Sequence, residues 1–191
     1  MEFNDVYDHD RNLTGKVHQR GTSWKNGEYG LVVCVWVYDG RGHLLLTRRA
    51  KGKSFAGTWE NSGGAVQAGE TSRQAIAREL FEETGIQADP EEFELLDSDC
   101  ERNIFYDHYC LKRRVRLQDI KLLPGETDDV MWASFVKIHW MIRSGKICRI
   151  IGSQFLRQEK ALRLRNMHKF KRRSEERRVG KECRSRWSPY H

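Results

Sequence analysis

A short stretch of the chain holds residue types whose spacing could do chemistry on a charged substrate. It runs from Gly64 to Ile86 and reads GAVQAGETSRQAIARELFEETGI. Its chemically active positions are Gly64, Glu70, Arg78, Glu79, Glu82, Glu83 and Gly85. Crowded carboxylates repel one another unless a cation lies among them, and oxygen ligands of full charge suit Mg²⁺ or Mn²⁺ better than zinc. The stretch therefore predicts a site for a hard divalent cation.

The same stretch predicts the helix that carries three of these glutamates. Thr71 and Gln74 form a capping box at its start, and Gly85 supplies a left-handed residue at its end. Residues three and four apart are neighbours on a helix surface, so the glutamates at 79, 82 and 83 are expected on one side. The side expected to face the core is formed by Ile76, Ala77, Leu80, Phe81 and Thr84.

The full pattern, G-x5-E-x7-R-E-[apolar]-x-E-E-x-G-[apolar], resembles the signature of the Nudix hydrolases. An acidic stripe alone would indicate a solvated helix face, but Gly64, Glu70 and Arg78 complete the signature. The resemblance implies an α+β fold, an α/β/α sandwich with a mixed sheet. It also implies a loop–helix–loop that binds divalent metals and cleaves a diphosphate linked to another group.

The resemblance also implies roles for the metal-site residues. Glu79, Glu82 and Glu83 would hold Mg²⁺ or Mn²⁺ ions that bridge two phosphates and activate the water that attacks phosphorus. The backbone at Gly63 and Gly64 would approach the metal closely, which favours residues without side chains. We therefore take these three glutamates and Gly64 as the candidate metal site.

Three further carboxylate and arginine positions are candidate catalytic residues. Glu70 would complete the coordination or help to deprotonate the water, and Arg78 would hold the glutamates in place. Glu126 follows Pro124 and Gly125 in a loop, where Nudix enzymes commonly bring one more carboxylate. A solvated acid in a turn is the alternative for Glu126.

Basic residues just before the signature could contact phosphate. Arg48 and Arg49 end an expected strand, and the guanidinium fork suits a diphosphate. We take both as candidate substrate-binding residues, with an exposed strand end as the alternative. Lys51 and Lys53 are secondary candidates in the loop that follows, and Trp59 suits either ring stacking or core packing.

The N-terminal segment DVYDHDRNLTGKVHQRG is similar to the isopentenyl-diphosphate isomerase branch of the same superfamily. That enzyme uses a cysteine just before the signature, but the corresponding residues 58–63, TWENSG, contain none. Cys34 lies in an expected buried strand, where a thiol is usually inert. The chain thus resembles the isomerase-like hydrolases. The isomerase itself and a non-catalytic, nucleotide-sensing Nudix domain remain alternatives, although a sensor would be expected to lose signature glutamates.

The last residues of the chain, 173–191, are set aside before the fold is considered. Their sequence, RSEERRVGKECRSRWSPYH, resembles a translated sequencing adapter and lacks the periodicity of a helix or a strand. Removing its six Lys/Arg and three Asp/Glu lowers the formal charge of the chain from +7 to +4. We therefore interpret the basic last helix as the outer face of a packed helix and do not expect a nucleic acid partner.

The rest of the chain is expected to form one domain, with residues 1–28 as an N-terminal hairpin extension and 29–172 as the hydrolase domain. Apolar periodicity predicts a buried central strand over 30–38 and a returning strand over 43–48. Further strands are expected over 93–99, 103–117 (partly exposed) and 130–135, and helices over 135–143 and 151–167. Strands on both sides of one helix, followed by terminal helices, indicate an α+β sandwich.

Composition and cysteine spacing indicate the cellular compartment in which the protein is expected to act. No membrane span, apolar leader or C-x-x-C pair is evident, so we expect a cytoplasmic protein with reduced thiols. The sequence predicts a Mg²⁺-dependent hydrolase of a nucleoside diphosphate linked to another moiety. Its binding partner is expected to be a small-molecule diphosphate substrate, and no membrane association is expected. The sequence does not indicate an oligomeric state.

Overall fold

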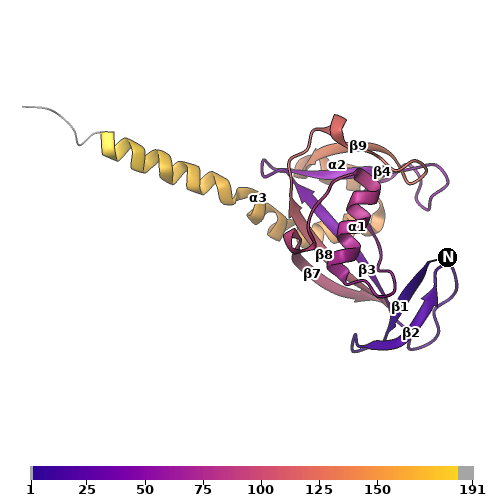
Figure 1. The fold of residues 1–191 in the computed structure, drawn as a ribbon. Coiled ribbons are helices and arrows are strands. Elements are labelled where there is room, and N and C mark those ends of the chain that lie inside the picture. Colours follow the sequence, from indigo (N-terminus) through magenta and orange to yellow (C-terminus); the bar gives the residue numbers. More distant parts are fainter. Residues whose placement is uncertain (1, 185–191) are drawn as a thin grey trace, which may run out of the picture.

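The computed structural model describes residues 2–184, with side chains up to residue 166. A seven-stranded sheet lies between α1 on one side and α2 with the first part of α3 on the other (Figure 1). Its strands are β3 (Gly30–Tyr38), β4 (His43–Arg49), β5 (Trp59–Glu60), β6 (Ser62–Ala65), β7 (Glu94–Glu101), β8 (Ile104–Lys112) and β9 (Thr127–Ser134). The helices are α1 (Ser72–Thr84), α2 (Phe135–Arg143) and α3 (Arg149–Arg184), with short 3-10 turns η1 (Pro90–Glu92) and η2 (Leu117–Asp119).

The apolar run predicted as a central strand forms the middle of the sheet. The strand order is β5-β4-β3-β8-β7, and β6 and β9 add to β3 and β4. β3 runs parallel to β8 and antiparallel to β4 and β6. A mixed sheet between two helical layers is the α+β sandwich expected from the sequence.

Each face of the sheet has its own apolar core. Val33, Val35 and Leu80 lie in the core beneath α1. On the other face, Trp36 packs with Phe155 of α3, and its indole Nε1 donates a hydrogen bond of 2.8 Å to Gln158. The alternation of β3 side chains between the two faces explains why nearly the whole strand is apolar.

The first two strands form a hairpin outside the main sheet (Figure 1). β1 (Phe3–Tyr7) pairs antiparallel with β2 (Leu13–Gln19). In the connecting turn, the Asp8 carboxylate accepts hydrogen bonds from the backbone of Asp10 and Asn12, and Arg11 has a φ of 66°.

Two expectations about element length are wrong. The strand expected over 103–117 is mostly buried and ends at Lys112. The side chain of the next residue, Arg113, donates to the Gln87 carbonyl and to Glu92, so the chain here follows the connection after α1. α3 runs to Arg184, so residues 173–184 are helical although their sequence lacks apolar periodicity. Arg, Lys and Glu have high helix propensity, and an existing helix extends without a new nucleus. The remaining tail residues, 185–191, lie outside the described part. Within residues 2–184, no helix is long and apolar enough to cross a membrane.

Candidate active site

The helix that carries the signature glutamates has both predicted caps. The Thr71 hydroxyl accepts a hydrogen bond of 3.3 Å from the Gln74 backbone N–H. In return, the Gln74 side-chain oxygen accepts one of 2.9 Å from the Thr71 backbone N–H. At the other end, Gly85 has a φ of 71° and its N–H donates to the Phe81 carbonyl. The caps satisfy orphaned backbone groups and define where α1 begins and ends.

The two faces of α1 differ from the prediction at two positions. Ile76, Leu80 and Thr84 are buried as expected, but Phe81 is 49% exposed. Glu83 is seven residues after Ile76, which at 3.6 residues per turn places it within about 20° of that buried residue. The buried side of the helix therefore includes a carboxylate and excludes an aromatic ring.

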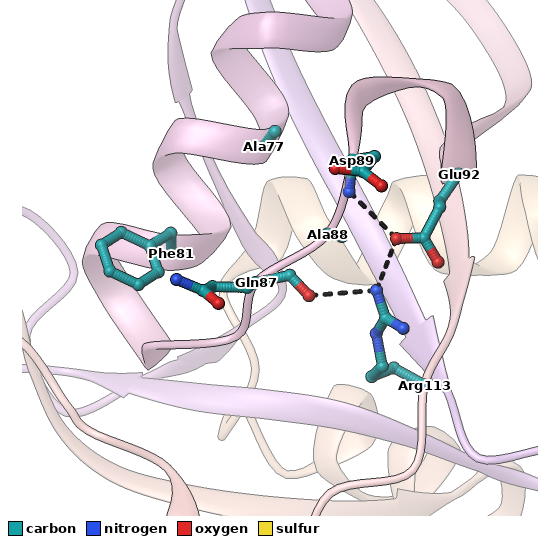
Figure 2. A pocket seen from close by; sticks show the side chains of 7 residues that line it. All are labelled: Ala77, Phe81, Gln87, Ala88, Asp89, Glu92 and Arg113. Carbon is teal, nitrogen blue, oxygen red and sulfur yellow. Dashed lines mark hydrogen bonds and ion pairs between the residues drawn. The ribbon is translucent and has the colours of Figure 1, made fainter.

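Phe81 lines an open hollow on the outer side of α1. This hollow, of about 600 Å³, is lined by Ala77, Phe81, Gln87, Ala88, Asp89, Glu92 and Arg113. Figure 2 shows Arg113 at its edge, where its guanidinium donates to the Gln87 carbonyl and to Glu92. None of the signature glutamates lines this hollow, so it is separate from the candidate active site.

The signature residues gather around a polar cavity of about 270 Å³. It is lined by Glu2, Arg20, Arg49, Lys53, Glu60, Gly63, Gly64, Gln67, Arg78, Glu79, Glu82, Glu83, Leu123 and Glu126. Arg49, Glu126 and most of the signature thus come together. Glu70 does not line the cavity but lies behind Arg78, and Arg48 does not reach it.

Arg78 connects the loop before α1 to the glutamates on the helix. Its Nε and Nη2 donate to the two oxygens of Glu70, at 2.7 and 2.9 Å. Its Nη1 donates to Glu79 at 2.8 Å and to Glu82 at 3.2 Å. The hydrogen bond from Arg78 lowers the pKa of Glu70, and Glu70 also accepts from the Gln67 backbone. This arrangement suits a residue that positions carboxylates.

Two of the glutamates are held in a buried, poorly solvated part of the cavity. Burial raises the pKa of Glu83 to about 8, and its Oε2 has no hydrogen-bond partner among the described residues. Burial also raises the pKa of Glu79 and outweighs the opposite effect of Arg78. A Cβ atom on Gly64 would overlap the Glu79 carboxylate. The glycine therefore leaves the space that this carboxylate occupies.

The donor set suits a hard divalent cation, although the side chains do not yet converge on one point. Among residues 2–184, no group of three or more His, Cys, Asp or Glu side chains is arranged so that it could hold a metal ion. Glu79 and Glu82 pair with Arg78 instead. A buried, unpaired carboxylate oxygen on Glu83 beside Glu79 is nonetheless what an oxygen-preferring ion would stabilise.

Each remaining basic residue of the cavity is paired with an acid. The Arg49 Nη1 donates to both oxygens of Glu60 at 2.7 Å. Lys53 forms an ion pair with Glu126. From the hairpin, Arg20 forms an ion pair with Glu2.

Sequence reasoning missed three charged residues of this cavity, namely Glu2, Arg20 and Glu60. Glu60 could have been found, because it is a carboxylate three residues before the glycine pair. Its burial, which raises its pKa, became visible only in the structure. The hairpin residues had no such signal, since only the fold brings them near residues about sixty positions away.

Arg48 is a candidate that the structure does not bring to the site. It donates to Asp128 at 2.6 Å, and its guanidinium lies 5.8 Å from the centre of the Trp59 ring. Neighbouring residues on a strand point to opposite faces, so Arg48 and Arg49 cannot both face the cavity. Trp59 itself is buried and belongs to the apolar core.

The thiols described in the structure lie outside the cavity. Cys34 is buried in β3, and burial raises its pKa to about 12. No cysteine is among the residues that line the described cavity. A cysteine acid of the isomerase type is therefore not present there.

Comparisons with known proteins agree with this geometry. A family model described as the NUDIX domain matches residues 28–147. An uncharacterized Nudix hydrolase of Listeria monocytogenes is 32% identical over 148 residues, which cover 76% of this chain and 88% of that protein. An isopentenyl-diphosphate Delta-isomerase of Enterobacter is 46% identical, but over 59 residues that cover only 30% of this chain and 32% of the isomerase.

A solved structure supports the fold independently. A crystal structure of a Deinococcus radiodurans protein superposes with a TM-score of 0.64 at 21% identity, over 77% of this chain and 92% of that one. The match in fold extends well beyond the signature helix. Signature, sheet topology and family match agree: the chain belongs to the Nudix family, as a hydrolase that acts on pyrophosphate bonds.

Proposed function

We propose that this protein hydrolyses a nucleoside diphosphate linked to another moiety and that it uses Mg²⁺ or Mn²⁺. The observation that carries the proposal is the cavity in which Glu79, Glu82 and Glu83 lie together with Gly64. A buried Glu83 oxygen without a partner is costly unless a cation or a proton compensates it. Residues 29–172 would form the hydrolase domain, and residues 1–28 its extension.

The three glutamates of α1 would hold the ion, and the rest of the signature would position them. A divalent cation bound there supplies charge stabilisation to the phosphates and lowers the pKa of water. Arg78 would keep Glu79 and Glu82 oriented, and Glu70 would anchor Arg78 through its two hydrogen bonds.

Glu126 is the candidate that could act on the attacking water from outside α1. It lines the cavity from the loop before β9 and is held by Lys53. Because Lys53 and Arg49 lie beside the same cavity, they would offset phosphate charge when the substrate enters. Arg48 is left out of this proposal.

The setting proposed from the sequence is a cytoplasmic one. The cysteines at 34, 100, 110 and 148 are free in the described structure, which suits a reducing compartment. The substrate would be a small molecule rather than a nucleic acid or a membrane.

The test of the proposal is a panel of nucleoside diphosphate derivatives incubated with Mg²⁺, with phosphate release as the readout. Glu82→Gln and Glu83→Gln should each lower kcat on the order of a thousandfold, because charge stabilisation is lost. Glu91→Gln is the control, since Glu91 is an exposed glutamate on η1. Binding of Mn²⁺, measured by calorimetry, should weaken in the first two variants only. Full activity in excess EDTA would contradict the metal requirement.

The isomerase is the second candidate, because a stretch of 59 residues is similar to that enzyme. The lack of a cysteine at the cavity argues against carbon-centred proton transfer. Isopentenyl diphosphate in D₂O with Mg²⁺, followed by NMR, should therefore show no enzymatic deuterium incorporation. Incorporation at an enzymatic rate would replace the hydrolase with the isomerase. A non-catalytic sensor would instead bind nucleotides without turnover in the panel.

A further inference from the structure

We propose that Arg20 of the N-terminal hairpin binds a free terminal phosphate of the substrate. The inference rests on the proposed function, and it narrows the other moiety of the substrate to one that presents a free phosphate. Arg20 lines the same cavity as the signature glutamates although it comes from a separate sheet. Neither its role nor that of the hairpin follows from the signature.

The hairpin is attached directly to the loop that leads into α1. The Asn4 amide donates to the Val66 carbonyl at 2.7 Å, and this contact is buried. The Ala68 N–H donates to the Phe3 carbonyl at 2.8 Å. The Gly69 N–H donates to the Asp5 carboxylate at 2.8 Å. The open end of the hairpin is therefore held against the signature loop.

The same end of the hairpin carries Arg20. Its backbone N–H donates to the Glu2 carbonyl at 3.0 Å, which continues the pairing of β1 and β2. Its guanidinium extends to the cavity, where the side chain pairs with the Glu2 carboxylate and stays 60% exposed. Its charge also acts on Glu79. The backbone of Arg20 is thus held in place, whereas its side chain is exposed and does not pack in the core.

Of the three arginines that line the cavity, Arg20 has the most exposed side chain. Arg78 is shared among three carboxylates and lies 21% exposed. Arg49 is bound to both oxygens of Glu60 and is 25% exposed. Among the residues with described side chains, Arg20 is bound only to Glu2, which is itself 48% exposed. An incoming dianion can displace such an exposed carboxylate, because exposed ion pairs contribute little.

The charge and shape of a terminal phosphate fit this position. A phosphate at the free end of a diphosphate carries more charge and more unsubstituted oxygens than a phosphate capped by a sugar. The guanidinium fork binds such a group through two parallel hydrogen bonds. Arg49 from β4 and Lys53 from the loop after it can offset the charge of the other phosphates. A substrate capped at both ends would leave Arg20 without a ligand.

A direct binding experiment tests Arg20 without requiring turnover. Methylene diphosphonate, which is not hydrolysed, is titrated into the full chain with Mg²⁺ in a calorimeter. Arg20→Ala should weaken its binding about tenfold to a hundredfold, because a charge-assisted hydrogen-bond pair is lost. Lys16→Ala is the matched control, since it removes one positive charge from an exposed position of β2 that does not line the cavity. Equal affinity of wild type and Arg20→Ala would overturn the proposal.

The Glu2→Gln variant provides an independent second measurement. Because Glu2 competes with phosphate for Arg20, its neutralisation should tighten methylene diphosphonate binding several-fold. Weaker or unchanged binding would show that Glu2 does not hold the phosphate position. This variant retains Arg20, so it remains informative even if Arg20→Ala does not fold.

Kinetics then distinguish terminal-phosphate binding from a general loss of charge. For a nucleoside triphosphate, in which the other moiety is a free phosphate, Arg20→Ala should raise KM about tenfold with kcat nearly unchanged, whereas a dinucleoside diphosphate capped at both ends should be unaffected. Equal effects on both substrates would contradict the assignment. If wild type cleaves neither these compounds nor any other member of the panel, the proposed hydrolase activity fails, while the calorimetric result still decides whether Arg20 binds phosphate.

Discussion

Two segments lie outside the region matched by the family model, and they attach to the domain in opposite ways. The hairpin formed by β1 and β2 joins the signature loop through polar contacts of Asn4, Asp5 and the Phe3 carbonyl. α3 covers the other face of the sheet with apolar side chains, Phe155 and Leu162, both fully buried. Beyond this packed part, α3 extends away from the domain (Figure 1).

Polar contacts and apolar burial have different consequences: the first can position residues of the site, and the second stabilises the fold. Hydrogen bonds are directional, so the hairpin can place Arg20 and the loop before Glu70 at defined points. Apolar burial is not directional and scales with area, so α3 contributes mainly to the free energy of unfolding. We therefore expect changes at the open end of the hairpin, which contacts the signature loop, to affect catalysis, whereas changes in α3 should affect stability alone.

The largest effect is expected in α3. Phe155→Ala removes a ring that packs 5.8 Å from Trp36 and 5.7 Å from Phe135, measured between ring centres. The free energy of unfolding should fall by about 3–5 kcal/mol in urea titrations. Leu156→Ala, at a 51% exposed neighbour, should change it by less than about 0.5 kcal/mol. The kcat/KM of folded Phe155→Ala should equal that of wild type, and a lower value would break the proposed separation.

A somewhat smaller loss is expected where the hairpin turn is anchored. Arg11 donates to Asp107 at 2.5 Å, and the Asp107 side chain is only 4% exposed. Arg11→Asn leaves this carboxylate with Ser98 as a remaining partner and should cost about 3 kcal/mol of stability. Asparagine tolerates the left-handed backbone of Arg11, and the control Arg102→Asn makes the same change at another left-handed turn residue. Equal stabilities of the two variants would contradict the anchoring role.

A change in the first strand should affect both stability and turnover. Asn4→Ala leaves the Val66 carbonyl without its buried donor, which should cost about 1–3 kcal/mol. Because the loop that follows Val66 leads to Glu70, kcat should also fall in the folded enzyme. Asn12→Ala, at an exposed turn position bonded only locally to Asp8, is the control. Stability loss without a change in kcat would show that the hairpin does not position the loop.

The smallest effect is expected at the C-terminus. A chain that ends at Arg172 should keep the melting temperature and the kcat/KM of the full chain, because the residues of α3 whose side chains are described reach the apolar core only as far as Leu162. A loss of more than about 1 kcal/mol would show that residues 173–191 belong to the folded protein. Sequencing the genomic locus across codon 173 tests their origin separately.

Local sequence was sufficient for the elements whose determinants lie close together. The capping box of Thr71 and Gln74 and the left-handed Gly85 each act over a few residues, so they predict α1 correctly. The apolar run of β3 is similarly local, since a strand buried on both faces needs no partner to be recognised. The end of β8 was not predictable in this way, because the side chain of the next residue, Arg113, binds the distant loop after α1.

By itself, the sequence determined the family, the signature helix and the chemistry that its carboxylates can support, because these depend on residue type and spacing along one helix. Only the tertiary structure decided which charges meet. It brought Arg20 and Glu2 from the hairpin to the cavity, turned Arg48 away to Asp128, and buried Glu83. Such pairings depend on distances between segments far apart in the chain, and spacing along the sequence carries no information about them.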